Sequence, residues 1–199
     1  MIFAIALEIV AFGVLWAGAN VLAAILAVSA TLFYVFVYSL WLKRTSKQNI
    51  VIGGAAGAMP VLVGWAAVTN SLGWTPVVLF VVIFLWTPPH FWALAIRHAD
   101  DYKAAGVPMM PVVVSLERTV RSMTVYAVLL TISTLVLIPV ADLGWIYGVT
   151  SLVFGVAFVI GAVRLGSDPS PKRSMRLFTF SITYVTAIFV ALTVDVLLR

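Results

Sequence analysis

The stretch WTPVVLFVVIFLWTPPHFWALAIR, residues 74–97, decides the fold, because its only Lys, Arg, Asp or Glu is the last residue. About 20 apolar residues in a helix cross a hydrocarbon core about 30 Å thick. Similar runs recur along the chain, which is 63% hydrophobic and 10% charged, with a mean hydropathy of +1.15. We therefore predict an all-α polytopic transmembrane helix bundle, forming one membrane domain over residues 1–199. Its seven predicted spans are 1–18, 20–42, 50–69, 74–97, 120–140, 143–165 and 176–198.

The basic residues are sorted to one side of the predicted membrane. Eleven of the twelve lie on or beside alternate connections, whereas the connections near Ala19, at 70–73 and at 141–143 have none. Because lysine and arginine concentrate in cytoplasmic loops, we expect the charged connections to face the cytoplasm, in a bacterial-type cytoplasmic (inner) membrane. This sorting also explains the pI near 9.8, so no nucleic-acid partner is expected. The eleven residues are Lys43, Arg44, Lys47, Arg97, Lys103, Arg118, Arg121, Arg164, Lys172, Arg173 and Arg176.

The fourth span carries two prolines and a histidine in its second half. Pro88 and Pro89 remove two backbone donors, so the carbonyls they free need other partners or a polar cavity. His90 follows them, and His98 lies eight residues further on, which is weak evidence for a shared metal site. By default, we interpret His90 as a residue that packs between helices and His98 as a residue at the membrane interface. The absence of cysteine excludes disulfides and thiolate metal sites.

The stretch HADDYKAAGVPMMPVV, residues 98–113, is a polar segment after that span, which we call the acidic insert. Asp100 and Asp101 lie at the predicted basic interface, with Arg97, His98 and Lys103 within reach. The two carboxylates either solvate a loop and balance its basic residues, or they bind Mg²⁺. In the second case the magnesium shell is completed by water and substrate phosphate oxygens, and the basic rim holds the remaining phosphate charge.

A second basic connection, residues 42–54, lies on the same predicted face. Lys43 and Arg44 are explained equally well by a phosphate-binding rim and by the positive-inside rule. Asn49 begins the next helix, where it either caps the helix or contacts a ligand. Gly53 and Gly57 stand four residues apart on one helical face, which predicts close packing of a neighbouring helix.

Three segments in this order resemble the protoheme IX farnesyltransferases, or heme O synthases, of the UbiA-type prenyltransferase superfamily. They are YSLWLKRTSKQNIVIGGAAGAMPVLVGWAAVT (38–69), FLWTPPHFWALAI (84–96) and DDYKAAGVPMMPVV (100–113). The resemblance extends over essentially the whole chain, including the closing RLFTFSITYVTAIFVALTVDVLL (176–198). It implies a UbiA-type fold and an enzyme that joins the farnesyl group of farnesyl diphosphate to a vinyl group of heme b, giving heme O and diphosphate.

The resemblance also assigns roles to individual residues. It implies that Asp101, Asp100 and Tyr102 are catalytic, with Asp101 ranked first because it directly precedes Tyr102. Asp100 and Asp101 are the implied ligands of Mg²⁺, which binds with the substrate diphosphate. A heme A synthase or a terminal oxidase assembly factor is the expected protein partner, besides the lipid bilayer. The implied substrate-binding residues are Lys43, Arg44, Asn49, Arg97, His98, Lys103 and His90.

The sequence departs from the family in one respect. Family members have nine spans and a first aspartate-rich motif between the second and third, whereas residues 1–99 hold only one acidic residue, Glu8. The seven predicted spans correspond to the family's third to ninth, so an N-terminally truncated chain is expected. Two other hypotheses remain open: a non-catalytic membrane protein that binds heme or an assembly partner, and a small-solute transporter. A charged site at the membrane surface counts against transport.

Overall fold

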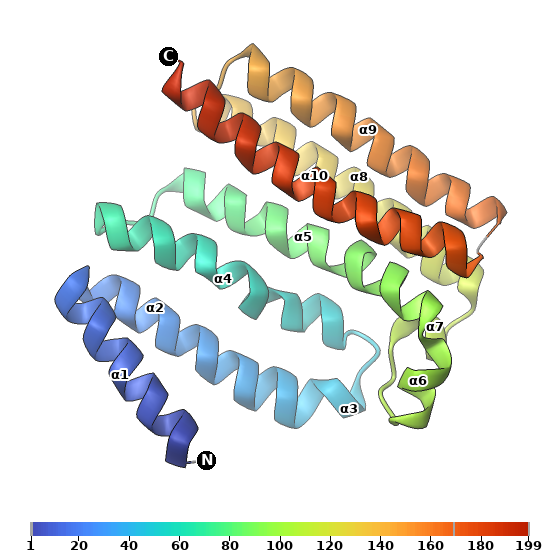
Figure 1. The fold of residues 1–199 in the computed structure, drawn as a ribbon, viewed down its shortest axis with the longest axis horizontal. Helices are drawn as coiled ribbons and strands as arrows, with labels where there is room; N and C mark the ends of the chain where they lie inside the picture. The colour runs from blue at the N-terminus through green and yellow to red at the C-terminus, as the bar shows by residue number, and fades with distance from the viewer. Residues whose placement is uncertain (1, 169, 199) are drawn as a thin grey trace.

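The computed structural model describes residues 2–168 and 170–198, and within them the secondary structure is entirely helical (Figure 1). The elements are α1 (Ile2–Gly18), α2 (Val21–Leu32), the π-helix η1 (Phe33–Leu42), α3 (Lys43–Thr45), α4 (Asn49–Thr69), α5 (Trp74–Arg97), α6 (Ala99–Ala104), α7 (Met110–Val113), α8 (Leu116–Val140), α9 (Trp145–Ser167) and α10 (Pro171–Leu197).

Six continuous helical segments among the described residues are long and apolar enough to cross a membrane. They confirm six of the predicted spans, and the predicted span 1–18 forms the shorter apolar helix α1. The surface between the helix ends is apolar, with Val156 of α9 46% and Ile182 of α10 45% exposed, as expected for side chains that face lipid. The protein is therefore a multi-pass integral membrane protein. The six segments are Val21–Thr45, Asn49–Thr69, Trp74–Arg97, Leu116–Val140, Trp145–Ser167 and Pro171–Leu197.

Two helices begin earlier than predicted, because a serine caps each of them. The Ser115 side chain accepts a hydrogen bond from the Arg118 amide ahead of α8, and Ser170 accepts one from the Arg173 amide ahead of α10. The first turns of both helices carry charged residues, which hydropathy assigned to the connections. The charged turns are thus helical extensions beyond the apolar spans.

Helix α5 is the centre of the bundle, packing against α4 on one side and against α8 and α10 on the other (Figure 1). Small residues allow these approaches: a β-carbon at Gly54 of α4 would lie 3.0 Å from the Thr87 methyl group of α5. The Trp86 indole donates a hydrogen bond to the Ser181 carbonyl of α10, 2.8 Å away. The helix continues through Pro88 and Pro89, both of which are buried.

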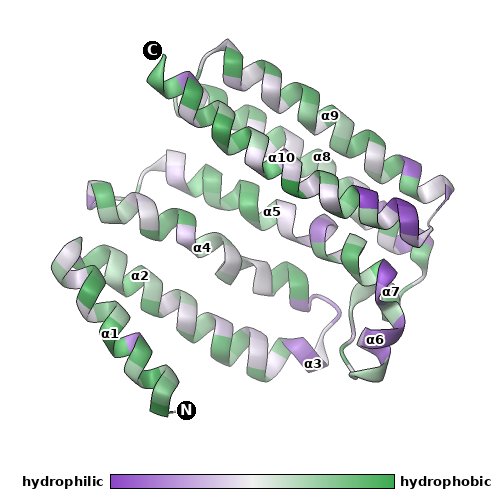
Figure 2. Cartoon of the chain, viewed as in Figure 1, coloured by the Kyte–Doolittle hydropathy of each residue, from purple (hydrophilic) through white to green (hydrophobic). Residues whose placement is uncertain are grey.

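Hydrophilic segments gather at one end of the bundle (Figure 2). That end holds α3, the acidic insert with α6 and α7, and the connection between α9 and α10. At the opposite end, Asp195 of α10 accepts hydrogen bonds from the backbone amides of Gly144 (2.5 Å) and Tyr147 (3.2 Å) at the start of α9. A carboxylate there stabilises the positive end of the helix dipole. The predicted sorting of basic residues to one face therefore corresponds to one end of the structure.

Candidate functional site

The acidic insert is a short helix folded back on the end of α5. Helix α6 carries Asp100 and Asp101 in its first turn, and the chain then turns at Gly106, whose φ of +64° suits glycine. The Val107 amide donates to the Tyr102 carbonyl at 3.0 Å. Met109 and Met110, which are 2% and 8% exposed, anchor the following segment in the core. The two carboxylates are thereby held on an ordered loop.

Both carboxylates of the insert are open to solvent. Asp101 Oδ2 lies 3.0 Å from His98 Nδ1, but the two side chains are 79% and 46% exposed. An exposed pair of this kind contributes at most about 1 kcal/mol, so it leaves Asp101 able to bind another partner. Asp100 makes no side-chain hydrogen bond or ion pair with the described residues. Arg97 and Lys103 are exposed beside them.

The donor set of the insert fits a magnesium ion that shares its shell with a phosphorylated substrate. Within residues 2–168 and 170–198, no three His, Cys, Asp or Glu side chains gather into a group that could hold a metal by itself. Two adjacent aspartates supply hard oxygen ligands, and Mg²⁺ commonly takes one or two carboxylates, keeping water and phosphate oxygens in its other positions. Zinc would need more protein ligands than this site offers.

Asn49 lies at the start of α4 and is completely buried. Its side-chain amide donates to the Lys43 carbonyl at 3.4 Å, which joins α4 to α3, while Gln48 occupies the N-cap position. The Asn49 Oδ1 atom has no hydrogen-bond partner among the described residues. An unpaired buried acceptor costs about 1–3 kcal/mol, so this atom favours a ligand or water that donates to it. Lys43 and Arg44 are exposed on α3.

A cavity of about 560 Å³ lies in the bundle between α2 and η1 on one side and α4 and α5 on the other. Its walls combine small residues with aromatic rings, and Gly57 opens onto it with no atom within 4 Å of an added β-carbon. The sequence predicted helix packing at Gly57; only Gly53 contacts a neighbouring side chain, the Tyr38 ring. The lining residues are Ala30, Thr31, Tyr34, Tyr38, Ile50, Gly53, Gly54, Ala56, Gly57, Ile83, Trp86, Thr87 and Phe91.

Tyr38 connects this cavity to the acidic insert. Its side chain lines the cavity, and Tyr102 on α6 lies near its phenol group. Ile50, the neighbour of Asn49, lines the same cavity. The arrangement therefore joins an apolar, aromatic chamber inside the bundle to two carboxylates at its hydrophilic end. An amphiphile fits this arrangement if its apolar tail lies in the chamber and its strongly anionic head binds a cation held by the two carboxylates.

His90 lies in the interface between α5 and α10. Its ring stacks between Trp86 (centroids 4.1 Å apart) and Phe178 (4.5 Å), and its Nδ1 lies 2.6 Å from Ser181 Oγ. Because the Ser181 hydroxyl donates to the Phe178 carbonyl at 2.6 Å, its oxygen accepts from His90, and the proton lies on Nδ1. The side chain is 8% exposed. The structure thus gives His90 a packing partner on each face of its ring.

The structure brings together most of the predicted site residues. Residues 97–103 are contiguous around α6, and Tyr38 of η1 lies near Tyr102 in this group. No hydrogen bond or ion pair joins Lys43 or Arg44 to the insert in the described part of the chain. The sequence did not single out Tyr34 or Tyr38. Their spacing of four residues, which places both on one helical face, and the glycines of the next helix could have indicated a cavity here.

Comparisons with known proteins agree with this architecture. The UbiA prenyltransferase family matches residues 1–190. Curated relatives called protoheme IX farnesyltransferase include proteins from Gloeobacter violaceus (53% identical over 98% of this chain), Parafrankia sp. (52% over 98%) and Mycolicibacterium smegmatis (46% over 98%). The chain spans 64% of the length of each of these three relatives.

A solved structure shares the fold. It comes from work on the biosynthesis of digeranylgeranylglyceryl phosphate synthase in membranes, and it matches with a TM-score of 0.80 over 97% of this chain and 67% of that one. At 18% sequence identity the likeness concerns the arrangement of helices alone.

Proposed function

Because this chain belongs to the UbiA prenyltransferase family, we propose that it transfers the farnesyl group of farnesyl diphosphate to a vinyl group of protoheme IX (heme b), giving heme O and diphosphate. The names of the relatives support this substrate pair, since they are about half identical to the chain over almost all of its length. The observation that carries the proposal is the aromatic cavity whose Tyr38 wall lies near Tyr102 of the acidic insert.

In this proposal the diphosphate binds at the insert. Asp100 and Asp101 hold Mg²⁺, which when bound with the diphosphate supplies positive charge to the leaving group. Exposed cations around the hydrophilic end bind the remaining phosphate oxygens, and the buried Asn49 Oδ1 accepts from water or a protonated oxygen of the ligand. Besides the catalytic Asp101, Asp100 and Tyr102, the proposed substrate-binding residues are Lys43, Arg44, Asn49, Arg97, His98, Lys103 and His90.

The farnesyl chain occupies the cavity between η1, α4 and α5. The allylic C–O bond breaks with its electron pair leaving on the diphosphate, and the vinyl group of heme b forms a new C–C bond to the allylic carbon. The positive charge then lies on the vinyl carbon next to the porphyrin ring, where a water molecule adds and loses a proton to give the hydroxyl group of heme O. The cavity faces of Tyr34, Trp86 and Phe91 stabilise the developing cation through their ring quadrupoles, and they exclude water that would capture it. Gly57, which has open space where a β-carbon would lie, leaves room for an isoprenoid chain beside these rings.

The hydrophilic end of the bundle is proposed to face the cytoplasm, in a bacterial-type inner membrane. Eleven basic residues at or near this end support that orientation. Farnesyl diphosphate is charged and reaches this side from water, while its tail enters the apolar cavity. The heme O product remains a membrane-soluble molecule, so a heme A synthase or a terminal oxidase assembly factor is the proposed partner that receives it.

The test is to express the chain in a host that makes no heme O and to identify extracted hemes by chromatography and mass. In parallel, calorimetry on the purified chain measures farnesyl diphosphate binding with and without Mg²⁺. We expect magnesium-dependent binding of farnesyl diphosphate by this chain, and heme O from a version extended to the full length of the relatives. An Asp100→Asn/Asp101→Asn variant is the negative control for both. A correctly inserted, stably folded chain that binds neither farnesyl diphosphate nor heme b would refute the proposal.

A further inference from the structure

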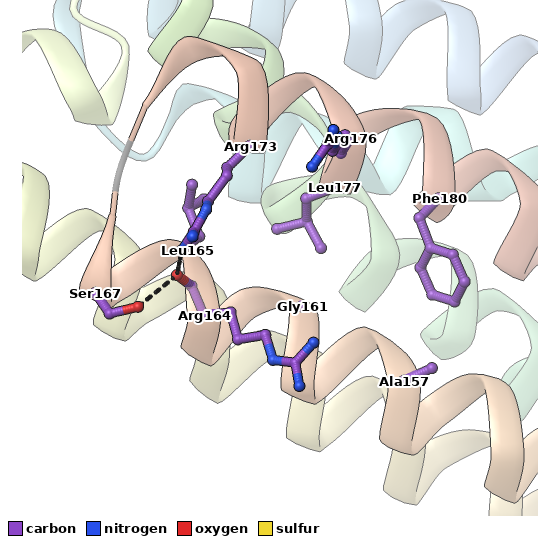
Figure 3. Close-up of a pocket in the computed structure, with 9 residues that line it drawn as sticks. All are labelled: Ala157, Gly161, Arg164, Leu165, Ser167, Arg173, Arg176, Leu177 and Phe180. Atoms are coloured by element: carbon purple, nitrogen blue, oxygen red, sulfur yellow. Dashed lines mark hydrogen bonds between the residues drawn. The ribbon is translucent and has the colours of Figure 1, made fainter.

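A second cavity at the hydrophilic end lies far along the chain from the acidic insert, between the end of α9 and the start of α10. Its volume is about 580 Å³. Three arginines line it, Arg164 from α9 and Arg173 and Arg176 from α10, together with apolar groups such as Leu177 and Phe180 (Figure 3). The proposed farnesyl transfer uses none of these residues.

The charge in this cavity is not balanced by the protein. Arg173 is engaged, because its Nε pairs with Asp168 Oδ2 at 3.0 Å and its Nη1 donates to the Arg164 carbonyl at 3.1 Å. The guanidinium groups of Arg164 and Arg176 make no hydrogen bond or ion pair with the described residues. Two cations from different helices therefore face one cavity without a partner anion. An anionic ligand matches this charge.

Sorting of basic residues to one side of the membrane does not account for this convergence. The positive-inside rule places arginines at one end of a bundle, but it does not direct them into a shared cavity. A third cavity at the hydrophilic end provides the contrast: Arg118 and Arg121 line it together with Glu117, so an acidic group is already present there.

The floor of the arginine cavity suits an acyl chain. Leu177 is 4% exposed. A β-carbon at Gly161 would lie 2.9 Å from the Leu177 Cδ1 atom, so the glycine lets Leu177 pack closely against α9. Phe180 lies one turn further into the bundle, stacked on Phe154 with the ring centroids 6.1 Å apart. Arg176 and Phe180 also line a neighbouring cavity of about 490 Å³ that includes Lys172. Cationic groups thus lie at the membrane surface, directly above apolar grooves.

We propose that this cavity binds an anionic phospholipid, with its phosphate between Arg164 and Arg176 and an acyl chain against Leu177 and Phe180. Basic cavities between transmembrane helices at this depth are where lipid phosphates lie, and each nearby cation contributes about 1 kcal/mol to such binding. The lipid joins α9 to α10 at the end where only a short connection links them. Phosphatidylglycerol has the required charge, and phosphatidylcholine does not.

The experiment measures lipid binding to the purified protein by native mass spectrometry, with phosphatidylglycerol, cardiolipin and phosphatidylcholine as probes. Arg164→Gln/Arg176→Gln should weaken phosphatidylglycerol binding about 30-fold, which corresponds to two cations at about 1 kcal/mol each. The matched control, Arg118→Gln/Arg121→Gln, removes the same charge at the same end and should change it less than about two-fold. Equal losses in the two variants would show nonspecific attraction and overturn the proposal.

A second variant keeps every charge and fills the cavity. Ala157 is exposed and lines it, so Ala157→Trp should fold normally and still reduce phosphatidylglycerol binding. Inorganic phosphate at millimolar concentration should not displace the lipid, because it lacks the acyl chain. Complete displacement by phosphate, or phosphatidylglycerol binding to Ala157→Trp as tight as to the parent chain, would contradict a lipid site.

Discussion

At the scale of single residues, the structure separates carboxylates that stabilise the fold from carboxylates that are available to a ligand. Asp195 is 2% exposed and caps the start of α9 through two backbone amides. Asp101 is exposed, and its side chain makes one weak contact with the described residues, to His98. A buried carboxylate with satisfied hydrogen bonds has no capacity left for a metal, whereas an exposed one can exchange water for Mg²⁺. Asp101 is therefore the residue on which to test the proposed site.

Replacing Asp101 by asparagine should weaken magnesium-dependent farnesyl diphosphate binding by roughly 10- to 100-fold, the range typical of altered metal sites. The amide keeps the shape of the side chain but lacks the negative charge that Mg²⁺ prefers. Titration calorimetry with and without magnesium measures the change. Glu117→Gln is the matched control, since it removes an exposed carboxylate outside the insert. Unchanged binding in Asp101→Asn would remove this residue from the proposed site.

Residue-level prediction succeeded where charge was conspicuous. Paired aspartates in an apolar chain indicated a site from the sequence alone. The unpaired oxygen of Asn49 and the role of Tyr38 required coordinates, because both depend on contacts between separate helices. The stacking of His90 between two rings also depends on α10, which lies far along the chain.

At the scale of elements, the π-helix η1 and helix α4 form the walls of the proposed farnesyl cavity. The wide turn of η1 places Tyr34 and Tyr38 on one wall, with their ring centroids 5.4 Å apart. π-helical turns inside helices often mark functional sites. Hydropathy predicted one uninterrupted span here, and it could not distinguish π from α geometry because both bury the same apolar residues.

Gly57→Leu should reduce farnesyl diphosphate binding about ten-fold by filling the cavity, while leaving thermal stability unchanged or slightly higher. Leucine has a helix propensity about 0.8 kcal/mol better than glycine, and no atom lies within 4 Å of an added β-carbon. Gly64→Leu is the control, because Gly64 lies on the same helix with equally open space and does not line the cavity. Equal binding by the two variants would show that the farnesyl chain lies elsewhere.

At the scale of the whole molecule, the described helices form one bundle with a hydrophilic end and an apolar middle (Figure 2). The sequence predicted this arrangement because the lengths of apolar runs and the placement of lysine and arginine are properties of the chain itself. It did not predict the convergence of Arg164 and Arg176, which lie on different helices. That information exists only in the way α9 packs against α10.

The proposed orientation can be tested with single cysteines, since the chain has none of its own. Lys47 lies at the hydrophilic end and Asn70 at the opposite end, and both are exposed. In intact cells, an impermeant thiol reagent should label Asn70→Cys and leave Lys47→Cys unlabelled until the membrane is permeabilised. Labelling in the opposite order would place the hydrophilic end, and the proposed active site with it, outside the cytoplasm.

The seam between α5 and α10 has a consequence for biosynthesis. The Trp86 indole and the His90 ring both bond to Ser181, which is 95 positions after Trp86. At about 5–20 residues per second, roughly 5–20 seconds of translation separate these two positions. During that interval α5 carries two polar groups without their final partner. A ribosome stalled before residue 181 would leave them exposed to lipid, so nascent α5 depends on prompt completion of the chain.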